Sequence, residues 1–223
     1  MHELPPRHDV ICIADVGCEA AEAKLWLDAH GRAARIRRGF VFGSCDQMRL
    51  WSPNPFLERV LTGIRGGHAI DLACGSGRDA VFIASCGFNV TAVDHLADAL
   101  GMGRELERRY LGEYQPIDWV CEDLDRYLPP GSFDLVACFY YLNRRLLSKA
   151  IKSLGPDGHL VVETFTTIHR SKFGKPKSEL LVLQPGELQD LCAELSIIEH
   201  EEAWHGDRHT ARLHGVRHET AIS

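Results

Sequence analysis

Residues 71–80, DLACGSGRDA, have the types and the spacing of a nucleotide-binding turn. An apolar stretch ends in the carboxylate of Asp71, the chain turns on Gly75 and Gly77, and a helical pattern begins at Arg78. Glycines at such a turn let the backbone approach a ligand closely. This run therefore predicts the strand–turn–helix unit of an α/β domain, with a nucleotide bound beside the turn.

Two kinds of nucleotide fit the turn. Gly75-x-Gly77-x-x-Ala80 matches the dinucleotide pattern G-x-G-x-x-G/A, and Asp94 follows about 20 residues on, where a ribose-binding acid belongs. A pyrophosphate at the helix N-terminus, however, would be repelled by Asp71. S-adenosylmethionine has no phosphate, and its sulfonium and ammonium groups both favour a nearby carboxylate. The sequence favours this cofactor, with an NAD(P)-binding oxidoreductase as the alternative.

Three carboxylates fall at or just after the ends of successive predicted strands. Asp71 is placed to accept from the methionine ammonium, Asp94 to bind both ribose hydroxyls, and Asp123 to accept from the adenine amine. The backbone N–H of Leu124 is a donor for a ring nitrogen of adenine. The simpler interpretation is that each acid caps the helix after it. Three acids at one edge, each with a matching ligand group, favour the cofactor site.

Composition restricts the function classes. The chain has 223 residues and a net charge of −6, which argues against a nucleic-acid partner held by general electrostatics. The first residues lack the pattern of a signal peptide, and no apolar run reaches the length of a membrane span, so we expect a cytoplasmic protein. The eight cysteines include no C-x-x-C pair, and we expect them to be small buried hydrophobic residues and not a metal site.

Apolar patterns alternate between strand and helix from residue 56 onward, which predicts a mostly parallel sheet covered by helices on both faces. The last two predicted strands are joined by a few residues and must be antiparallel. The polar stretch 166–184 is long for a connection, and we expect a lid loop there. The predicted strands cover residues 68–72, 89–93, 117–121, 133–139, 159–165, 196–204 and 210–217, and the predicted helices cover 56–63, 78–86, 97–110, 144–154 and 185–194.

The region 52–218 resembles class I S-adenosylmethionine-dependent methyltransferases. The motifs that carry the likeness are 71–77, Asp94, 122–124 and the turn 154–160, which the family usually writes L-K-P-G-G-x-L. Ala73 stands where the family usually has glycine, and we expect an alanine there to be harmless if its φ is negative. The resemblance implies a Rossmann-like seven-stranded sheet with an antiparallel C-terminal hairpin. The cofactor-binding residues that we infer are Asp71, Ala73, Gly75, Gly77, Arg78, Asp94, His95, Asp123, Leu124 and Phe139.

A narrower resemblance links residues 71–80, 163–166 and 172–177 to a bacterial group near the tellurite-resistance and thiopurine methyltransferases. It implies a small-molecule acceptor with a soft sulfur, selenium or tellurium nucleophile. In-line methyl transfer to such an atom needs alignment and no general base at neutral pH. A non-enzymatic module that only binds the cofactor is a further alternative.

The acceptor is expected to meet the segment after the fourth strand of the sheet. Tyr140 and Tyr141 are candidate walls of the acceptor pocket, and Arg144 or Arg145 is a candidate partner for an anionic substrate. The alternative is that one tyrosine is core and both arginines are solvated. Glu163, at the end of the next strand, is a weaker candidate, as is its neighbour Thr164.

Two further groups have simpler interpretations. Residues 54–56, Asn-Pro-Phe, resemble a motif of nucleic-acid methylating enzymes but stand in the wrong place, so we interpret them as a segment that packs near the cofactor. Histidines recur at positions 200, 205, 209, 214 and 218, where we expect exposed alternate residues of a hairpin and no metal. His169 lies among basic residues at 170–177, and we expect a solvated loop, with attraction of an anionic acceptor as the alternative.

Residues 1–51 are expected to form a small α/β appendage, and 52–223 the methyltransferase domain. Residues 10–18 and the Ala-rich helical pattern after them resemble the C-terminal half of a rhodanese domain. Ala14 stands at the position of the catalytic cysteine, and Cys18 is displaced from it, so we expect a degenerate fragment without sulfur transfer.

Overall fold

The computed structural model describes residues 11–14, 19–31, 34–37, 51–64, 66–112 and 116–218. The chain divides into two compact units, Met1–Ser52 and Pro53–Ser223. In the first unit, strands β1 (Ile11–Ala14) and β2 (Ala34–Arg37) pair in parallel, with helix α1 (Glu19–Ala29) between them in the chain. A helical crossover between parallel strands makes this a βαβ unit.

Several predictions for the N-terminal segment lie outside the described residues. Positions 15–18, which include Cys18 of the rhodanese-like segment, are among them, as is Val10. The sequence also indicates a strand over 35–42, of which residues 38–42 are not described. The degenerate rhodanese fragment therefore stays a prediction.

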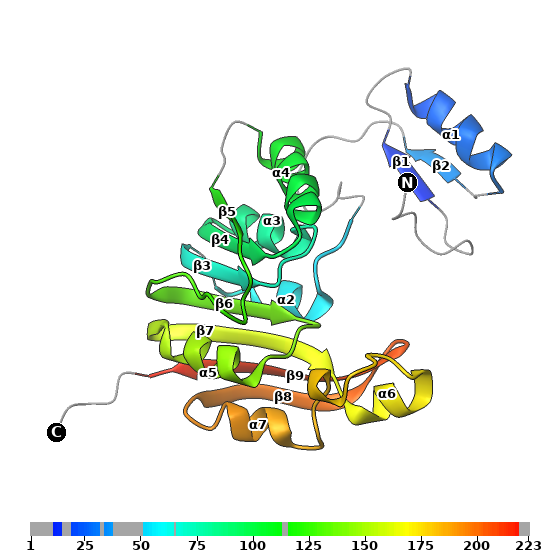
Figure 1. Cartoon of the computed structure of the whole chain (residues 1–223). Helices are drawn as coiled ribbons and strands as arrows, with labels where there is room; N and C mark the ends of the chain where they lie inside the picture. The colour runs from blue at the N-terminus through cyan, green and yellow to red at the C-terminus, as the bar shows by residue number, and fades with distance from the viewer. Residues whose placement is uncertain are drawn as a thin grey trace. The chain divides into compact units, whose positions relative to one another are not determined.

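The second unit is built on a seven-stranded sheet in the order β5-β4-β3-β6-β7-β9-β8. Strands β3 to β7 are parallel, β9 runs antiparallel to both of its neighbours, and β8 and β9 form the terminal hairpin (Figure 1). The prediction of a Rossmann-like methyltransferase sheet with an antiparallel hairpin is confirmed. The strands are β3 (Gly67–Leu72), β4 (Phe88–Asp94), β5 (Ile117–Cys121), β6 (Phe133–Phe139), β7 (Leu154–Phe165), β8 (Ser196–His205) and β9 (Arg208–Arg217).

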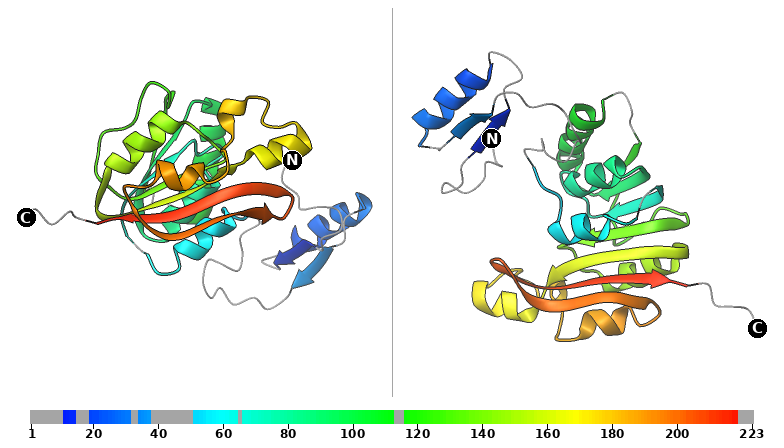
Figure 2. Two further views of the ribbon diagram at one scale, coloured as in Figure 1. Left: turned by 90° about the horizontal axis from the view of Figure 1, so that it is seen from below. Right: turned by 180° about the vertical axis from the view of Figure 1, so that it is seen from behind.

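Helices cover both faces of this sheet. Helices α5 and α7 lie on one face and α2, α3 and α4 on the other, as the opposite views in Figures 1 and 2 show. Parallel strands need such cover because both of their faces are apolar. The helices are α2 (Pro55–Val60), α3 (Arg78–Ser85), α4 (Ala97–Leu111), α5 (Arg144–Lys152), α6 (Thr167–Phe173) and α7 (Glu187–Leu191), with a 3-10 turn at Glu179–Leu181.

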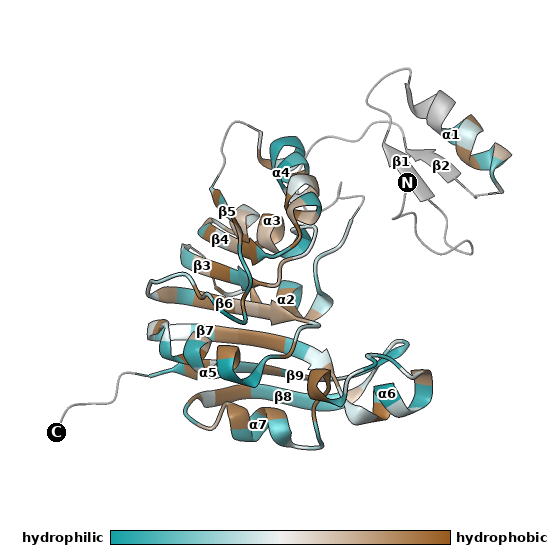
Figure 3. Ribbon diagram, in the orientation of Figure 1, coloured by the Kyte–Doolittle hydropathy of each residue, from teal (hydrophilic) through white to brown (hydrophobic). Residues whose placement is uncertain are grey.

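The core follows from the apolar runs of the central strands. Ile70, Val136 and Leu160 come from β3, β6 and β7 and are completely buried under α5 and α7. Figure 3 shows the hydrophobic colouring concentrated along the central strands, with hydrophilic residues prominent on α4. Within the described part of the chain, no helix is long and apolar enough to cross a membrane.

The cysteines depart in part from the prediction that all are buried. Cys86, Cys138 and Cys192 are buried, but Cys121 is exposed, because it ends edge strand β5. Cys74 is half-buried at the glycine turn. Nothing is described of the side chains of the three cysteines before residue 51.

Two local predictions were wrong. The stretch 166–184 is not a structureless loop, because it contains α6 and the 3-10 turn. The polar sequence of α6 has no apolar stripe to reveal it, since its one buried residue is His169. Strand β7 begins at Leu154 and not at residue 159, because Leu154 pairs with Phe133 and the turn 155–158 is a bulge within the strand.

Candidate functional site

Asp71 lies at the centre of the sheet near its carboxyl edge. It belongs to β3, paired with Ala92 of β4 and Ala137 of β6, and only 2% of its surface is exposed. Its Oδ2 atom has no hydrogen-bond partner among the described residues. Burial, and then the neighbouring carboxylate of Asp79, raise the pKa of Asp71 well above its usual value. A buried carboxylate oxygen without a donor is a place where a cationic ligand group would be stabilised.

Asp94 holds the glycine turn in place. Its Oδ2 accepts from the Gly75 N–H at 2.8 Å, and its Oδ1 accepts from the Leu96 N–H at 2.9 Å. The carboxylate therefore joins the turn after β3 to the start of α4. Each carboxylate oxygen accepts more than one hydrogen bond, so both retain capacity for ribose hydroxyls.

The turn itself needs left-handed backbone. Gly75 and Gly77 have φ of +54° and +75°, conformations that glycine adopts without strain. Ala73 also has a positive φ, +58°. The condition under which alanine was expected to be harmless, a negative φ, is therefore not met, because the chain already turns away from the sheet at this residue. An alanine in this conformation stores strain of about 1–2 kcal/mol at the edge of the candidate site.

Trp119 lies against the glycine turn and was not foreseen as part of the site. A Cβ atom at Gly77, or at Gly103 of α4, would overlap the Trp119 ring. The indole Nε1 donates to Glu107 Oε2 at 2.7 Å, which satisfies a carboxylate that is itself buried. The one signal in the sequence is Gly103, since a glycine inside a helical pattern often marks close packing.

The other predicted cofactor residues lie around the same edge. Leu124 and Phe139 are buried, whereas Asp123 and His95 are exposed. The Asp123 carboxylate accepts from the backbone N–H of Asp125 at 3.0 Å. His95 Nδ1 lies 3.5 Å from Asp94 Oδ1.

Arg78 and Asp79 open helix α3 directly after the glycine turn. Burial raises the pKa of Asp79 to about 6, although a backbone donor from Asn54 and the charge of Arg78 both lower it. The Asp79 carboxylate also accepts from the Asn54 N–H at 2.6 Å, so it connects the start of α3 to the segment before α2.

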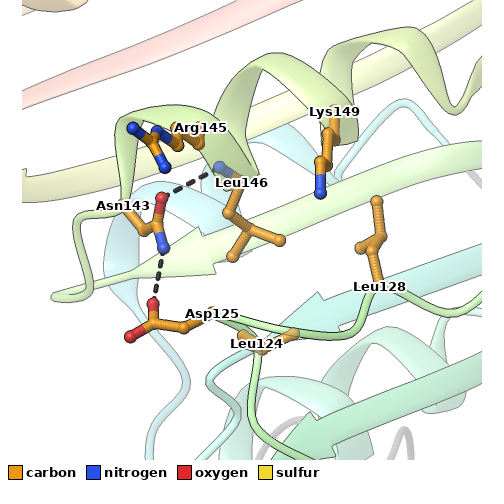
Figure 4. A pocket seen from close by; sticks show the side chains of 7 residues that line it. All are labelled: Leu124, Asp125, Leu128, Asn143, Arg145, Leu146 and Lys149. Atoms are coloured by element: carbon orange, nitrogen blue, oxygen red, sulfur yellow. Dashed lines mark hydrogen bonds between the residues drawn. The ribbon is translucent and has the colours of Figure 1, made fainter.

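A pocket of about 390 Å³ borders this edge between the turn after β5 and helix α5 (Figure 4). Asn143 links its two sides, donating to Asp125 at 2.6 Å and accepting from the Leu146 N–H at 3.0 Å. Of the predicted cofactor residues only Leu124 lines it, so the pocket adjoins the candidate site and does not contain Asp71 or Asp94.

Asn54 connects the segment before α2 to the sheet. Its Oδ1 caps α2 by accepting from the Phe56 N–H at 2.8 Å, and its Nδ2 donates to Glu163 Oε2 at 2.9 Å. The other oxygen of Glu163 accepts from the Thr210 hydroxyl at 2.6 Å. Glu163 is thus a buried, hydrogen-bonded carboxylate beside Tyr140, whose hydroxyl lies 3.4 Å from Asn54 Nδ2.

Tyr140 differs from the other two acceptor candidates. Its backbone has φ of +57°, its N–H donates to the Glu163 carbonyl at 2.8 Å, and 37% of its surface is exposed. The Tyr141 hydroxyl instead donates to Asp125 Oδ1 at 3.1 Å, and burial with this contact raises its pKa to about 12.

The guanidinium of Arg144 is held by the segment 180–187. It donates to both carboxylate oxygens of Glu187, at 2.5 and 3.0 Å, and to the carbonyls of Leu180 and Val182. These contacts give Arg144 a role in holding that segment to α5. Arg145 is exposed and lines the pocket described above.

Three histidines are buried where exposed residues were expected. His209 and His214 belong to β9, where His214 pairs with Val161 of β7 and His209 pairs with Trp204 of β8, and His169 Nδ1 accepts from the His209 N–H at 3.3 Å. His214 Nε2 lies 2.9 Å from Nδ1 of His159, and burial lowers the pKa of His214 to about 4. Among the described residues, no three His, Cys, Asp or Glu side chains gather as metal ligands would.

Comparison with known proteins finds methyltransferases among the proteins that this chain resembles. Residues 69–158 match a family described as a methyltransferase domain. The chain is 30% identical over 123 residues to the ubiquinone biosynthesis O-methyltransferase of Idiomarina loihiensis, which covers 52% of this chain and 48% of that protein. It is also 30% identical over 115 residues to the demethylmenaquinone methyltransferase of Clavibacter sepedonicus. That match covers 49% of this chain and 45% of the relative. The chain spans about half the length of these curated relatives.

Solved structures show the same fold. The N-methyltransferase NodS of Bradyrhizobium japonicum has a TM-score of 0.59 at 19% identity, covering 73% of this chain and 93% of its own. TehB of Haemophilus influenzae has a TM-score of 0.59 at 18% identity, and the match covers 72% of this chain and 61% of the TehB chain. A second NodS structure contains S-adenosyl-L-homocysteine and has a TM-score of 0.59 at 20% identity, covering 74% and 88%. Residues 69–158 thus match a methyltransferase domain, and the solved structures share the fold of the second unit.

Proposed function

We propose that this protein transfers a methyl group from S-adenosylmethionine to a small-molecule acceptor. The observation that carries the proposal is Asp71, a carboxylate buried beside the glycine turn with one oxygen unpartnered. The resemblance to the tellurite-resistance and thiopurine group supports a soft sulfur, selenium or tellurium nucleophile as the accepting atom. The relatives named above include both an N- and an O-methyltransferase, so the fold leaves the accepting atom open.

The charges of the site suit a cationic cofactor. Asp71, Asp79 and Asp94 lie close enough that Asp79 and Asp94 both raise the pKa of Asp71. A pyrophosphate would add more negative charge to three acids, whereas a sulfonium and an ammonium would neutralise part of theirs. This is the reason to prefer S-adenosylmethionine over a dinucleotide, although the turn fits both.

Each residue at the edge has a part in the proposal. S-adenosylmethionine, when bound, supplies a methyl group activated by a sulfonium. Asp71 would hold its ammonium, Asp94 its ribose, and Asp123 with the Leu124 N–H its adenine. The Asp94 carboxylate is already oriented by the Gly75 and Leu96 N–H groups, so little is lost in ordering it when ligand binds.

The acceptor would approach from the side of Tyr140, which follows Phe139 at the end of β6. A soft nucleophile needs positioning and not deprotonation by a base. This agrees with the absence of an unpartnered oxygen on Glu163, since both of its oxygens accept hydrogen bonds.

Calorimetric titration with S-adenosylmethionine, S-adenosylhomocysteine and NADH tests the proposal. We expect the first two to bind and NADH not to bind. Ligand at a hundred times its Kd should stabilise the fold by about 2.7 kcal/mol, visible as a higher melting temperature. Asp94→Asn should weaken binding at least tenfold, because one ribose-binding oxygen is replaced by a donor.

Asp98→Asn is the matched control, because Asp98 is an exposed carboxylate in the first turn of α4. It should bind the cofactor like the unmodified protein. Binding of NADH with no response to S-adenosylmethionine would overturn the proposal in favour of an oxidoreductase. Cofactor binding without S-adenosylhomocysteine production from thiols, selenite, tellurite or phenols would favour a binding module.

We propose in addition that residues 1–51 are a rhodanese-like remnant attached to a methyltransferase domain of residues 52–223. The βαβ arrangement of β1, α1 and β2 supports an α/β origin for this segment. A sulfurtransferase assay with thiosulfate and cyanide should show no turnover, because Ala14 replaces the sulfur-carrying cysteine in the resemblance. Turnover above the level of a Cys18→Ala variant would contradict this.

A further inference from the structure

Six aromatic rings form a continuous cluster at the carboxyl edge of the sheet, on the acceptor side of the candidate site. Neighbouring ring centroids lie between 4.5 and 6.5 Å apart. The rings come from the ends of β6, β7 and β8, the start of β9, and α6, which lies beside the tip of the β8–β9 hairpin in Figures 1 and 2. The cluster consists of Tyr140, Phe165, His169, Phe173, Trp204 and His209.

The inner rings of the cluster are buried and its outer rings face solvent. His169 and His209 are buried, and Phe165 stacks on His169 at 4.5 Å. The outer rings are those of Tyr140, Phe173 and Trp204, with 37%, 47% and 42% of their surfaces exposed. Single exposed aromatics are ordinary, but exposed rings that share one packed cluster mark a binding surface.

Two cations lie over the outer rings. Lys172 Nζ is 4.2 Å from the Trp204 ring centroid, and Arg208 Cζ is 5.0 Å from the Tyr140 ring centroid. Among the described residues Lys172 makes no ion pair, and Arg208 makes a loose one of 3.9 Å to Asp207, which is almost fully exposed. The remaining basic side chain of α6, Arg170, is instead paired with Glu179.

This arrangement selects one ligand chemistry. Aromatic faces favour a flat aromatic molecule, since offset-stacked rings gain energy beyond area burial. Cations at the outer rings favour a negative charge on that molecule. The surface joins the candidate site through Tyr140, whose N–H is bonded to the Glu163 carbonyl and which follows Phe139.

We propose that this aromatic cluster, with Lys172 and Arg208, is the acceptor subsite, and that the acceptor is a planar aromatic anion. The inference rests on the proposed methyltransferase function and names the acceptor class for it. The soft accepting atom would be carried by the aromatic molecule, and the carboxylate or a similar anion would be held by the two cations.

Ligand-observed NMR titration with 2-naphthoate tests the subsite, with the full chain both free and loaded with S-adenosylhomocysteine. We expect 2-naphthoate to bind, naphthalene-2-carboxamide to bind several-fold more weakly for lack of charge, and cyclohexanecarboxylate to bind more weakly still for lack of an aromatic face. Trp204→Leu should weaken 2-naphthoate roughly tenfold, and Lys172→Gln and Arg208→Gln roughly threefold each.

The matched controls are Trp26→Leu, an exposed tryptophan of the first unit, and Lys152→Gln, an exposed lysine of α5. Both should leave 2-naphthoate binding unchanged. Equal affinity for all three probes, or equal effects of the cluster and control variants, would overturn the proposal. So would affinity that falls as protein concentration rises, because a second copy of the chain would then cover the cluster.

The readouts keep the two proposals separate. If S-adenosylhomocysteine binds and 2-naphthoate does not, the subsite is wrong and the methyltransferase function stands. If 2-naphthoate binds the cluster and S-adenosylhomocysteine does not bind at all, the proposed function fails.

Discussion

Among the described residues, Ala73, Tyr140 and Asp157 occupy left-handed backbone without being glycine, and Ala73 and Asp157 stand where the methyltransferase motifs that they resemble usually have glycine. Ala73 has φ of +58° and Asp157, in the turn before the main part of β7, has φ of +54°. Aspartate tolerates this region better than alanine does, because its short polar side chain bonds locally. Of these two motif positions, Ala73, which stands two residues after Asp71, therefore carries the larger strain.

Ala73→Gly should stabilise the protein. Glycine removes the steric cost of a positive φ, about 1–2 kcal/mol, and loses about 0.4–1 kcal/mol through the freer unfolded chain. The expected net gain in the free energy of unfolding is between about zero and 1.6 kcal/mol, measured by urea denaturation. Ala99→Gly, within helix α4, is the control and should destabilise by about 1 kcal/mol. A loss of stability in Ala73→Gly as large as in the control would show that the strain is absent.

At the scale of elements, the glycine turn packs against a side chain of another strand, Trp119. Trp119 of β5 lies against Gly77 at the start of α3 and Gly103 within α4, and its indole is fixed by Glu107. The turn, two helices and an edge strand are therefore one packing unit. The packing of this unit depends on the Trp119 ring, which is not part of the glycine-turn motif.

Gly77→Ala should be more harmful than Gly75→Ala. Both positions have positive φ, but an added Cβ at Gly75 meets open space, while at Gly77 it overlaps the Trp119 ring. Strain alone costs about 1–2 kcal/mol at Gly75, and overpacking adds about 1–3 kcal/mol at Gly77. Chemical denaturation of both variants measures this order. Adding Trp119→Leu should recover part of the loss in Gly77→Ala and none in Gly75→Ala, and recovery in neither would refute the packing argument.

Arg144 connects elements and is predicted to act through them. Arg144→Lys keeps the charge but loses the paired contacts to Glu187 and the carbonyls of residues 180 and 182. Hydrogen exchange should rise in residues 179–187 while S-adenosylhomocysteine affinity stays within about twofold. Arg145→Lys, the exposed neighbour, should change neither. A large loss of turnover in Arg144→Lys with unchanged exchange would restore Arg144 as a substrate-binding residue.

The elements could be predicted from the sequence wherever apolar period and turn residues agree. β5 and β6 were predicted with their observed ends because apolar residues dominate both, and the hairpin follows from its short connection. Helix α6 could not be predicted, because its buried residue is a histidine that packs on Phe165. Asp71, Gly75 and Asp94 could be selected from the sequence as candidate site residues, and Glu163 as a weaker candidate. Trp119 and the aromatic cluster could not be selected, because they depend on contacts between distant segments.

At the scale of the whole molecule, negative charge is concentrated where a cation is expected. The net charge is −6, and at the carboxyl edge the carboxylates of Asp79 and Asp94 both raise the pKa of Asp71. Burial holds the pKa of Asp79 at about 6 and that of Asp71 well above its usual value. In the free protein Asp79 is therefore protonated below about pH 6, and a cationic ligand that favours the ionised carboxylate releases this proton.

Cofactor affinity should consequently rise with pH. Because the pKa of Asp79 is about 6, Asp79 carries a proton below about pH 6 and attracts no cation. Above that pH its carboxylate is charged. Binding that favours the charged form releases protons, so Kd should fall by up to about tenfold per pH unit for each proton released as pH rises from 5 to 7. Calorimetry in two buffers of different ionisation enthalpy counts the protons. S-adenosylmethionine should release more than S-adenosylhomocysteine, which lacks the sulfonium, and Asp79→Asn should flatten the profile near pH 6. A Kd independent of pH for both ligands would mean that the acids do not face the cofactor.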